Sequence, residues 1–143
     1  KLDGIVTGAM FSNYQRDRIE KVCDSVGLKI FSPLWHKTQE VEMRELLQLG
    51  FSLIFVVIAA EGLDSSWLGR KITLKDVEKL AELQQKMGFN CAGEGGEFES
   101  VVLDGPLYSK KIILDEISVV EESEHCAHLI VEKAHLEEKK EKN

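Results

Sequence analysis

Three glycines and three glutamates fall within seven consecutive residues, from Gly93 to Glu99. Glycine permits a positive φ and lets a neighbouring group come close, so this segment predicts a tight loop and no helix. Residues 97–103 suit a strand, in which Glu97 and Glu99 would share a face, about 6.5 to 7 Å apart. These two carboxylates, with Glu94, are candidates for holding a cation or moving a proton. A solvated strand edge after a glycine turn is the plainer alternative.

A second candidate site lies in residues 8–18, where a short strand meets the start of a helix. Small residues let a flat base or ribose lie against the backbone, and the free N–H groups of a helix start suit a phosphate. Arg16 and Arg18 add positive charge, although an ordinary capped first turn explains the same residues. The candidates for nucleotide contact are Gly8, Ala9, Ser12, Tyr14, Gln15 and Arg16.

The elements that must position these residues follow from the hydrophobic patterns. Residues 2–7 predict a short buried strand, and Ser12 or Asn13 can cap a helix that ends at Gly27. Its expected core stripe is Ile19, Val22, Cys23 and Val26. With a second strand at residues 29–31, this order is typical of a βαβ unit in a parallel sheet.

The rest of the chain predicts a second group of elements. We expect a helix capped by Thr38, then a strand at residues 53–60 that is buried on both faces in a parallel or mixed sheet. An irregular turn at 63–70 and a helix from the Thr73 capping box to Gly88 should follow. The last expected element is a hairpin of residues 110–120 with 127–134. The predicted class is α/β: the back half of a Rossmann-like parallel nucleotide-binding sheet, followed by a mixed α+β lobe. The expected domains are residues 1–36 and 37–136, with a frayed tail at 137–143.

Composition narrows the class of function. The formal net charge of −7 argues against strong electrostatic binding to the phosphate backbone of a nucleic acid. No apolar run approaches the roughly 20 residues of a membrane helix. Cys23, Cys91 and Cys126 are odd in number and widely spaced, which favours a reducing, cytoplasmic compartment and neither a disulfide framework nor a zinc site. The histidines show no metal-ligand spacing, so no metal ligands are predicted, and a homo-oligomer is left open.

Five segments together resemble the diphthine–ammonia ligase family, a branch of the alpha-type ATP pyrophosphatases (PP-loop superfamily, with a HUP domain). In order they are GAMFSNYQRDRIEKVC, GLKIFSPLW, GFSLIFVV, GLDSSWLGR and AGEGGEFESVVLDGPL. The resemblance covers nearly the whole chain, from Leu2 to about Leu136. Family members open with a Ser-Gly-Gly-Lys-Asp-Ser pyrophosphate loop, and this chain has no such motif. We expect the loop upstream of Lys1, and expect these 143 residues alone to be inactive.

The resemblance implies an enzyme that adenylates the carboxylate of diphthine, a modified histidine of translation elongation factor 2. Ammonia then displaces AMP to form the amide of diphthamide, so ATP is converted to AMP and pyrophosphate with Mg²⁺ as the expected cation. A transition state rich in phosphoryl charge needs cations and N–H donors to stabilise it. The alternative is a non-catalytic nucleotide- or small-molecule-binding module that keeps the fold without the loop.

The resemblance also assigns roles to residues. Glu94, Glu97 and Glu99 are the expected catalytic glutamates, which could hold Mg²⁺, deprotonate ammonium, or face the trimethylammonium group of diphthine beside aromatic rings such as Trp67 or Phe98. These three alternatives stay open, and both tryptophans could equally be core residues. The expected substrate-binding residues are Trp35, Asp64, Trp67, Leu68, Gly69, Arg70, Gly95 and Gly96.

Overall fold

The computed structural model describes residues 2–8 and 12–139 and consists of two compact units. Unit 1 is Lys1–Thr38 and unit 2 is Gln39–Asn143, so the division falls close to the boundary expected after residue 36. Within the described residues, unit 1 contains a parallel sheet with one α-helix, and unit 2 contains an antiparallel sheet with two α-helices. The mixed α/β class predicted from the sequence is confirmed.

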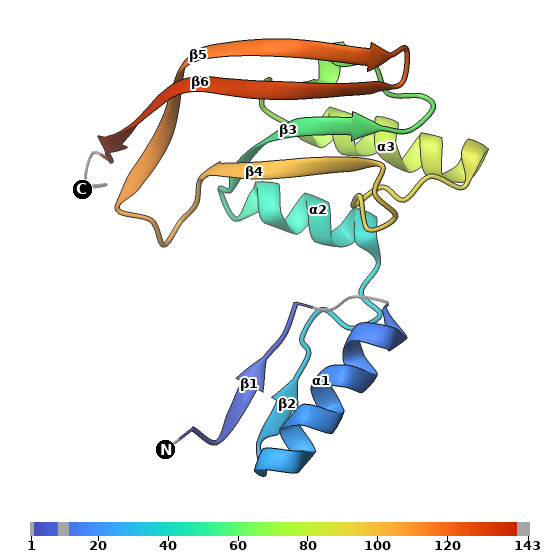
Figure 1. Cartoon of the computed structure of the whole chain (residues 1–143), viewed down its shortest axis with the longest axis vertical. Coiled ribbons are helices and arrows are strands. Elements are labelled where there is room, and N and C mark those ends of the chain that lie inside the picture. The colour runs from blue at the N-terminus through green and yellow to red at the C-terminus, as the bar shows by residue number, and fades with distance from the viewer. Residues whose placement is uncertain (1, 9–11, 140–143) are drawn as a thin grey trace. The chain divides into compact units, whose positions relative to one another are not determined.

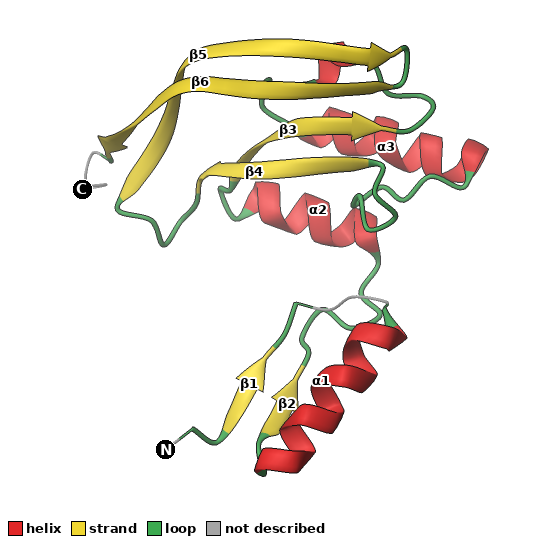
Figure 2. Ribbon diagram, in the orientation of Figure 1, coloured by secondary structure: helices red, strands yellow, loops and turns green. Residues whose placement is uncertain are grey.

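Unit 1 is a strand, a helix and a second strand: β1 (Gly4–Val6), α1 (Asn13–Val26) and β2 (Lys29–Phe31), as Figures 1 and 2 show. The strands β1 and β2 are parallel, with Ile5 paired to Ile30. A parallel pair needs a crossover connection, and α1 supplies it. The predicted βαβ unit is therefore confirmed.

Helix α1 has the caps that its sequence predicts. Ser12 is the N-cap and accepts a hydrogen bond from the Gln15 N–H at 3.3 Å, and Gly27 ends the helix in the left-handed conformation. The expected core stripe is only partly correct: Cys23 is buried, but Val22 and Val26 are each 63% exposed. A two-stranded sheet is too narrow to cover the whole stripe.

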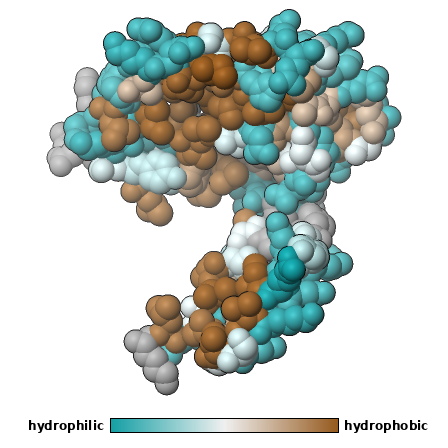
Figure 3. Space-filling model, viewed as in Figure 1, coloured by the Kyte–Doolittle hydropathy of each residue, from teal (hydrophilic) through white to brown (hydrophobic). Residues whose placement is uncertain are grey.

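The sheet of unit 1 is also more open than predicted. Val6 and Phe31 are 73% and 64% exposed, so the expectation of a fully buried first strand is wrong. Figure 3 shows the corresponding apolar surface over β1 and β2.

The described part of unit 2 consists of one four-stranded antiparallel sheet with two α-helices. Its sheet has the order β4-β3-β6-β5, and every pairing is antiparallel. The elements are α2 (Gln39–Gln48), β3 (Ser52–Ala59), the single 3₁₀ turn η1 (Ser65–Trp67), α3 (Leu74–Met87), β4 (Phe98–Asp104), β5 (Lys110–Ser123) and β6 (Cys126–Glu138).

Strand β3 is the centre of this core, because Ile54, Phe55 and Ile58 are completely buried. Leu80 of α3 belongs to the same cluster, and Leu47 of α2 packs against it. A strand buried on both faces was predicted here, but in a parallel or mixed sheet; the structure shows it between antiparallel neighbours. Helices lie on one side of the sheet (Figure 2), and the segment after η1 bridges to β3 at Ile54 and Phe55, which gives these two residues a backbone neighbour beside the sheet.

The predicted hairpin is confirmed as the pair β5–β6, which is longer than expected at both ends. Glu137 and Glu138 were assigned to a frayed tail, yet they pair with Lys111 and Lys110 at the end of β6. Each pair also forms a salt bridge, at 2.6 and 2.7 Å respectively. Cross-strand ion pairs thus extend the strand into a segment that its composition alone marked as solvated.

Candidate functional site

The glycine–glutamate loop is held by its own polar groups. Asn90 Oδ1 accepts hydrogen bonds from the N–H groups of Ala92 and Glu94, both at 3.2 Å. The Glu97 carboxylate accepts one from the Asn90 N–H at 2.8 Å and one from the Gly95 N–H at 2.9 Å. The loop therefore closes on the side chain of Glu97, immediately before β4 begins.

Two glycines of this loop make close contacts. Gly93 has φ 77°, and a Cβ there would lie 2.8 Å from Cε2 of the buried Phe98 ring. A Cβ at Gly95 would lie 2.6 Å from Glu97 Oε1. The tight loop predicted from the glycine cluster agrees with these contacts.

The three candidate glutamates occupy different environments. Glu97 is half-buried and its carboxylate is engaged within the loop, whereas Glu94 and Glu99 are exposed. Among the residues that the structure describes, neither exposed carboxylate has a hydrogen bond or ion pair. Of the three candidates, Glu94 of the loop and Glu99 of β4 are therefore the carboxylates without a partner among the described residues.

The row of paired residues around Glu99 shows where that side chain points. Val57 of β3 is paired with Glu99 on one side and with His128 on the other. The next residue, Ile58, is paired with the buried Phe98 and Ala127. Since successive side chains of a strand alternate between faces, Glu99 and His128 lie on the face opposite the Phe98 core.

A small hollow lies beside Glu97, at the carboxyl end of α3. Its volume is about 220 Å³, and it is lined by Ala60, Glu61, Met87, Gly88, Phe89 and Glu97. Both charged residues of this lining are acidic. The hollow therefore favours a small cation or a neutral amine over an anion.

The tryptophan turn after β3 has its own local support. Asp64 is the N-cap of η1 and accepts a hydrogen bond from the Ser66 N–H at 2.9 Å. The hydrogen bonds from the side chain and backbone of Ser66 lower the pKa of Asp64. The irregular turn predicted for residues 63–70 contains this single 3₁₀ turn.

Trp67 forms part of an aromatic stack, and both faces of its ring have neighbours. The stack continues from Trp67 to Phe55 at 5.9 Å and from Phe55 to Phe98 at 3.9 Å, measured between ring centroids. The Arg70 guanidinium lies over the Trp67 ring, 4.6 Å from its centroid. Trp67 is 7% exposed, so the core interpretation left open by the sequence is the one that the packing supports.

Each guanidinium nitrogen of Arg70 has a partner. Two of its nitrogens meet the two Asp76 oxygens, Nη1 at 2.9 Å and Nη2 at 3.0 Å, and Nε donates to the Ser66 carbonyl at 3.0 Å. Burial alone would raise the pKa of Asp76, but hydrogen bonds from Arg70 and Thr73, with the Arg70 charge, lower it to about 2. This ion pair ties the tryptophan turn to the start of α3.

The next two predicted substrate residues lie against the core. Leu68 is 8% exposed and bridges to Phe55, and the Gly69 N–H donates to the Phe55 carbonyl at 3.0 Å. A Cβ at Gly69 would lie 3.1 Å from Ile117 and 3.3 Å from Leu129. These contacts give Leu68 and Gly69 a packing role. Gly96, in contrast, has open space around it.

The predicted nucleotide residues belong to unit 1, and Ala9 lies outside the described residues. Nothing in the described residues, 2–8 and 12–139, lies within 4 Å of where a Cβ on Gly8 would stand, which leaves room for a flat group. The Ser12 hydroxyl caps the Gln15 N–H, as described above. The two arginines are engaged locally: Arg16 with Glu20 at 2.6 Å, and Arg18 with the Tyr14 hydroxyl and ring.

Trp35 was predicted to bind substrate, and the structure places it in unit 1. The Arg16 guanidinium lies 4.8 Å from the centroid of its ring, and His36 packs against it at 4.9 Å with the rings tilted. His36 has a positive φ of 59°, which is uncommon for a residue other than glycine.

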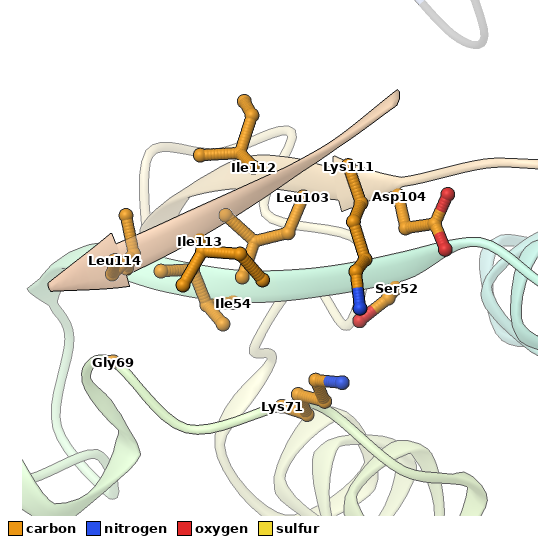
Figure 4. A pocket seen from close by; sticks show the side chains of 10 residues that line it. All are labelled: Ser52, Ile54, Gly69, Lys71, Leu103, Asp104, Lys111, Ile112, Ile113 and Leu114. Carbon is orange, nitrogen blue, oxygen red and sulfur yellow. The ribbon is translucent and has the colours of Figure 1, made fainter. Parts of the chain in front are cut away.

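A second hollow in unit 2, shown in Figure 4, has a volume of about 240 Å³ and lies where β3 and β5 begin and β4 ends. Of the predicted site residues only Gly69 lines it. Its polar side chains are Ser52, Lys71, Asp104 and Lys111. Lys111 pairs with Glu137 and Asp104 with Lys139, so two of the three charged side chains that border this hollow already have ion-pair partners.

One cluster was missed in the sequence analysis. Glu122, Cys126 and His128 bring a carboxylate oxygen, a thiol and an imidazole nitrogen within 4.8 Å of one another. The sequence did carry an indication of this cluster. Cys126 and His128 are two residues apart, and that spacing places both side chains on one face of a strand. The carboxylate comes from the partner strand, and only the pairing of β5 with β6 reveals it.

Comparison with known proteins identifies the family. The diphthamide synthase C-terminal domain matches residues 38–137, and the diphthamide synthase N-terminal domain matches residues 1–30. Diphthine–ammonia ligases of Homo sapiens and Mus musculus are 40% and 39% identical to it, each over 97% of this chain and 54% of the relative. The diphthine–ammonia ligase of Schizosaccharomyces pombe is 42% identical over 85% of this chain and 20% of that protein.

The chain thus has relatives that match nearly its whole length. That length comprises a parallel βαβ unit and an antiparallel α+β unit with the glycine–glutamate loop. The chain belongs to the diphthamide synthase family. It spans about half the length of the mammalian relatives it matches. No helix in the described part of the chain is both long and apolar enough to cross a membrane.

Proposed function

We propose that this chain forms part of an ATP-dependent diphthine–ammonia ligase, which converts diphthine on translation elongation factor 2 into diphthamide. The proposed route is adenylation of the diphthine carboxylate, followed by attack of ammonia and release of AMP; pyrophosphate leaves in the first step. The support is the name shared by relatives that are 39% and 40% identical over 97% of the chain.

The structural observation that best supports this role is the difference in hydrogen bonding and exposure among the three glutamates. Glu97 closes the loop, and this leaves Glu94 and Glu99 as exposed carboxylates without partners among the described residues. Amide formation from ammonia and an activated carboxylate requires the nitrogen to lose a proton. A free carboxylate beside the reacting nitrogen can accept that proton.

The same two carboxylates suit the other cationic participants. Oxygen ligands of this type are those that Mg²⁺ prefers, and a carboxylate also attracts the trimethylammonium group of diphthine. Trp67 is a weaker candidate for that group, because Phe55 and Arg70 already cover its ring. In this proposal Glu94 and Glu99 therefore meet the cations, and Trp67 supports the turn.

The residues of unit 1 fit one part of ATP better than the rest. The open space at Gly8 suits the adenosine end, whereas Arg16 and Arg18 are engaged with Glu20 and Tyr14. When bound, ATP supplies the leaving group that makes the carboxylate reactive. Unit 1 is proposed to orient the nucleoside, and the triphosphate would need donors beyond the described residues.

The engagement of these arginines also favours a second candidate function. A nucleotide- or small-molecule-binding module without catalytic activity needs an open surface at Gly8, but no phosphate cradle. The two functions differ in their product: only the ligase converts diphthine to diphthamide.

The test is complementation of a yeast strain that lacks its own diphthine–ammonia ligase, using the complete gene that encodes this chain. Mass spectrometry of elongation factor 2 distinguishes diphthine from diphthamide directly. We expect diphthamide with the unchanged gene, and a reduced fraction with Glu99→Gln. Glu116→Gln, an exposed change on β5, is the matched control and should leave the fraction unchanged. Accumulation of unmodified diphthine with a well-expressed, unchanged protein would instead support the binding module.

A further inference from the structure

The end of the β5–β6 hairpin brings together three side chains of different chemistry. Glu122 comes from β5, and Cys126 and His128 come from β6. The Cys126 thiol donates to Glu122 Oε2 at 3.5 Å, and His128 Nε2 lies 3.0 Å from Glu122 Oε1. One donor atom from each residue lies within 4.8 Å of the other two.

We propose that Glu122, Cys126 and His128 form a binding site for Zn²⁺. Zinc binds thiolate sulfur, imidazole nitrogen and carboxylate oxygen at about 2.3, 2.0 and 2.0 Å, in a tetrahedral arrangement. Donors around such a centre with one sulfur ligand are roughly 3.3 to 3.5 Å apart, which follows from those bond lengths. Cys126 Sγ lies 3.5 Å from Glu122 Oε2, and His128 Nε2 lies 3.0 Å from Glu122 Oε1, both near that spacing. One donor atom of each residue lies within 4.8 Å of the other two, so binding requires the side chains to draw closer together.

The backbone holds these donors in place from both strands. Cys126 and His128 flank Ala127, which is 1% exposed and points into the core, so the two donors share the opposite face. A register shift between Glu121 and Ser123 leaves Glu122 without a directly opposed residue. Irregularities of this kind re-aim a side chain, and here the side chain meets the two β6 donors.

The site is open to solvent on one side. The His128 and Glu122 side chains are 37% and 60% exposed. Three protein ligands with access to water are the composition of zinc sites that keep a fourth, exchangeable position. Binding would replace the proton of the Cys126 thiol, which would be released to solvent, with the metal.

The same hairpin offers a natural control. His135 and Asp115 form another histidine–carboxylate pair, with Nδ1 and Oδ2 2.8 Å apart, and that pair has no neighbouring thiol among the described residues. If a histidine beside a carboxylate were sufficient, both pairs would take up metal equally. The thiol of Cys126 is what sets the proposed site apart.

The first experiment uses the purified chain with cobalt chloride as a spectroscopic substitute for zinc. We expect one equivalent of Co²⁺ to produce visible bands of a tetrahedral centre and a thiolate charge-transfer band, and zinc chloride to displace both. Cys126→Ser should abolish the charge-transfer band. His128→Ala and Glu122→Gln should each weaken Zn²⁺ affinity at least about tenfold, since even changes around a ligand commonly cost that much. His135→Ala should leave both readouts unchanged.

A second measurement needs no variant and so does not depend on the folding of one. Cys23 and Cys91 are buried at 3% and 0% exposure, so alkylation of the folded chain reports mainly on Cys126. One equivalent of zinc should slow that alkylation at least about tenfold if the thiolate is a ligand. Unchanged alkylation, or a cobalt spectrum that survives Cys126→Ser, would overturn the proposal and leave a hydrogen-bonded cluster without metal.

Discussion

The Glu97 carboxylate accepts a hydrogen bond from the Gly95 N–H at 2.9 Å, and a Cβ on Gly95 would lie only 2.6 Å from Glu97 Oε1. The glycine is therefore the residue that lets this carboxylate reach the backbone. Together with the hydrogen bonds to Asn90 Oδ1, this contact between Glu97 and Gly95 closes the loop that carries Glu94.

Glu97 and Glu99 are expected to respond differently to substitution, although both were predicted to be catalytic. Glu97→Ala removes the acceptor for two loop N–H groups and should lower the free energy of unfolding by about 1 to 3 kcal/mol. Glu99→Gln on the exposed face should change it by less than about 0.5 kcal/mol, while reducing diphthamide formation by the complete protein. Urea denaturation and mass spectrometry of elongation factor 2 provide the two readouts. Equal stability losses for both variants would assign both residues to the scaffold.

The loop glycines make a matched pair. Gly96 has φ 87° with nothing near its Cβ position, so Gly96→Ala should cost about 1 to 2 kcal/mol from backbone strain alone. Gly93→Ala adds a collision with the Phe98 ring and the Phe98 carbonyl to a comparable φ, and should cost more. Thermal unfolding of the two variants tests the order. If Gly96→Ala proved the more destabilising, the close contact at Gly93 would not be important.

The Arg70–Asp76 pair should make unit 2 sensitive to acid. The pKa of Asp76 in the folded chain, about 2, lies below its ordinary value of 3.8, so the carboxylate stabilises the fold above about pH 4. That contribution, roughly 2 kcal/mol from the size of the shift, is lost as the pH falls through about 2. The Asp76→Asn variant should have a lower free energy of unfolding near neutral pH. Its free energy of unfolding should also depend less on pH between about 2 and 4.

The measurement should report on unit 2 alone. Trp67 is buried beside Arg70, so its fluorescence in a Trp35→Phe background follows urea unfolding of that unit. Asp17→Asn, an exposed change on α1, is the control and should leave the profile as it is. A steep acid dependence that persists in Asp76→Asn would assign the effect to other carboxylates.

Residues 1–143 alone are expected to release no AMP and pyrophosphate from ATP. The reason is that Arg16 and Arg18 are engaged within unit 1, and no glycine-rich loop followed by a lysine is present in the sequence. A coupled pyrophosphate assay with the purified chain tests this, with a longer form that carries a pyrophosphate loop as the positive control. Steady turnover by the 143 residues would show that the phosphate site lies within them.

Much of the local structure could be predicted from the sequence, because local interactions determine it. Ser12 and Gly27 delimit α1, and the Thr73 capping box begins α3, since caps act within one turn of a helix. The loop at Gly93 was also predictable, because a run of glycines specifies its own backbone. The class of fold and the family follow from the same short segments.

The roles of individual side chains depended on contacts between distant segments. Arg70 was expected to meet substrate, and that role stays a prediction. The structure shows its guanidinium paired with Asp76 and lying over the Trp67 ring, and no local pattern predicts that arrangement. Glu97 and Glu99 were expected to act together, but the loop captures the first, while strand pairing places the second on the open face.

The sequence by itself therefore determined the family, the class of fold, the caps and the existence of the glycine–glutamate loop, because each depends on residues a few positions apart. Only the tertiary structure decided which glutamates remain free. It also brought Glu122 next to Cys126 and His128, through the register of β5 against β6. The physical reason is that a carboxylate, an arginine or a thiol takes its role from whichever charge or donor comes within about 3 to 4 Å, and folding alone sets those distances.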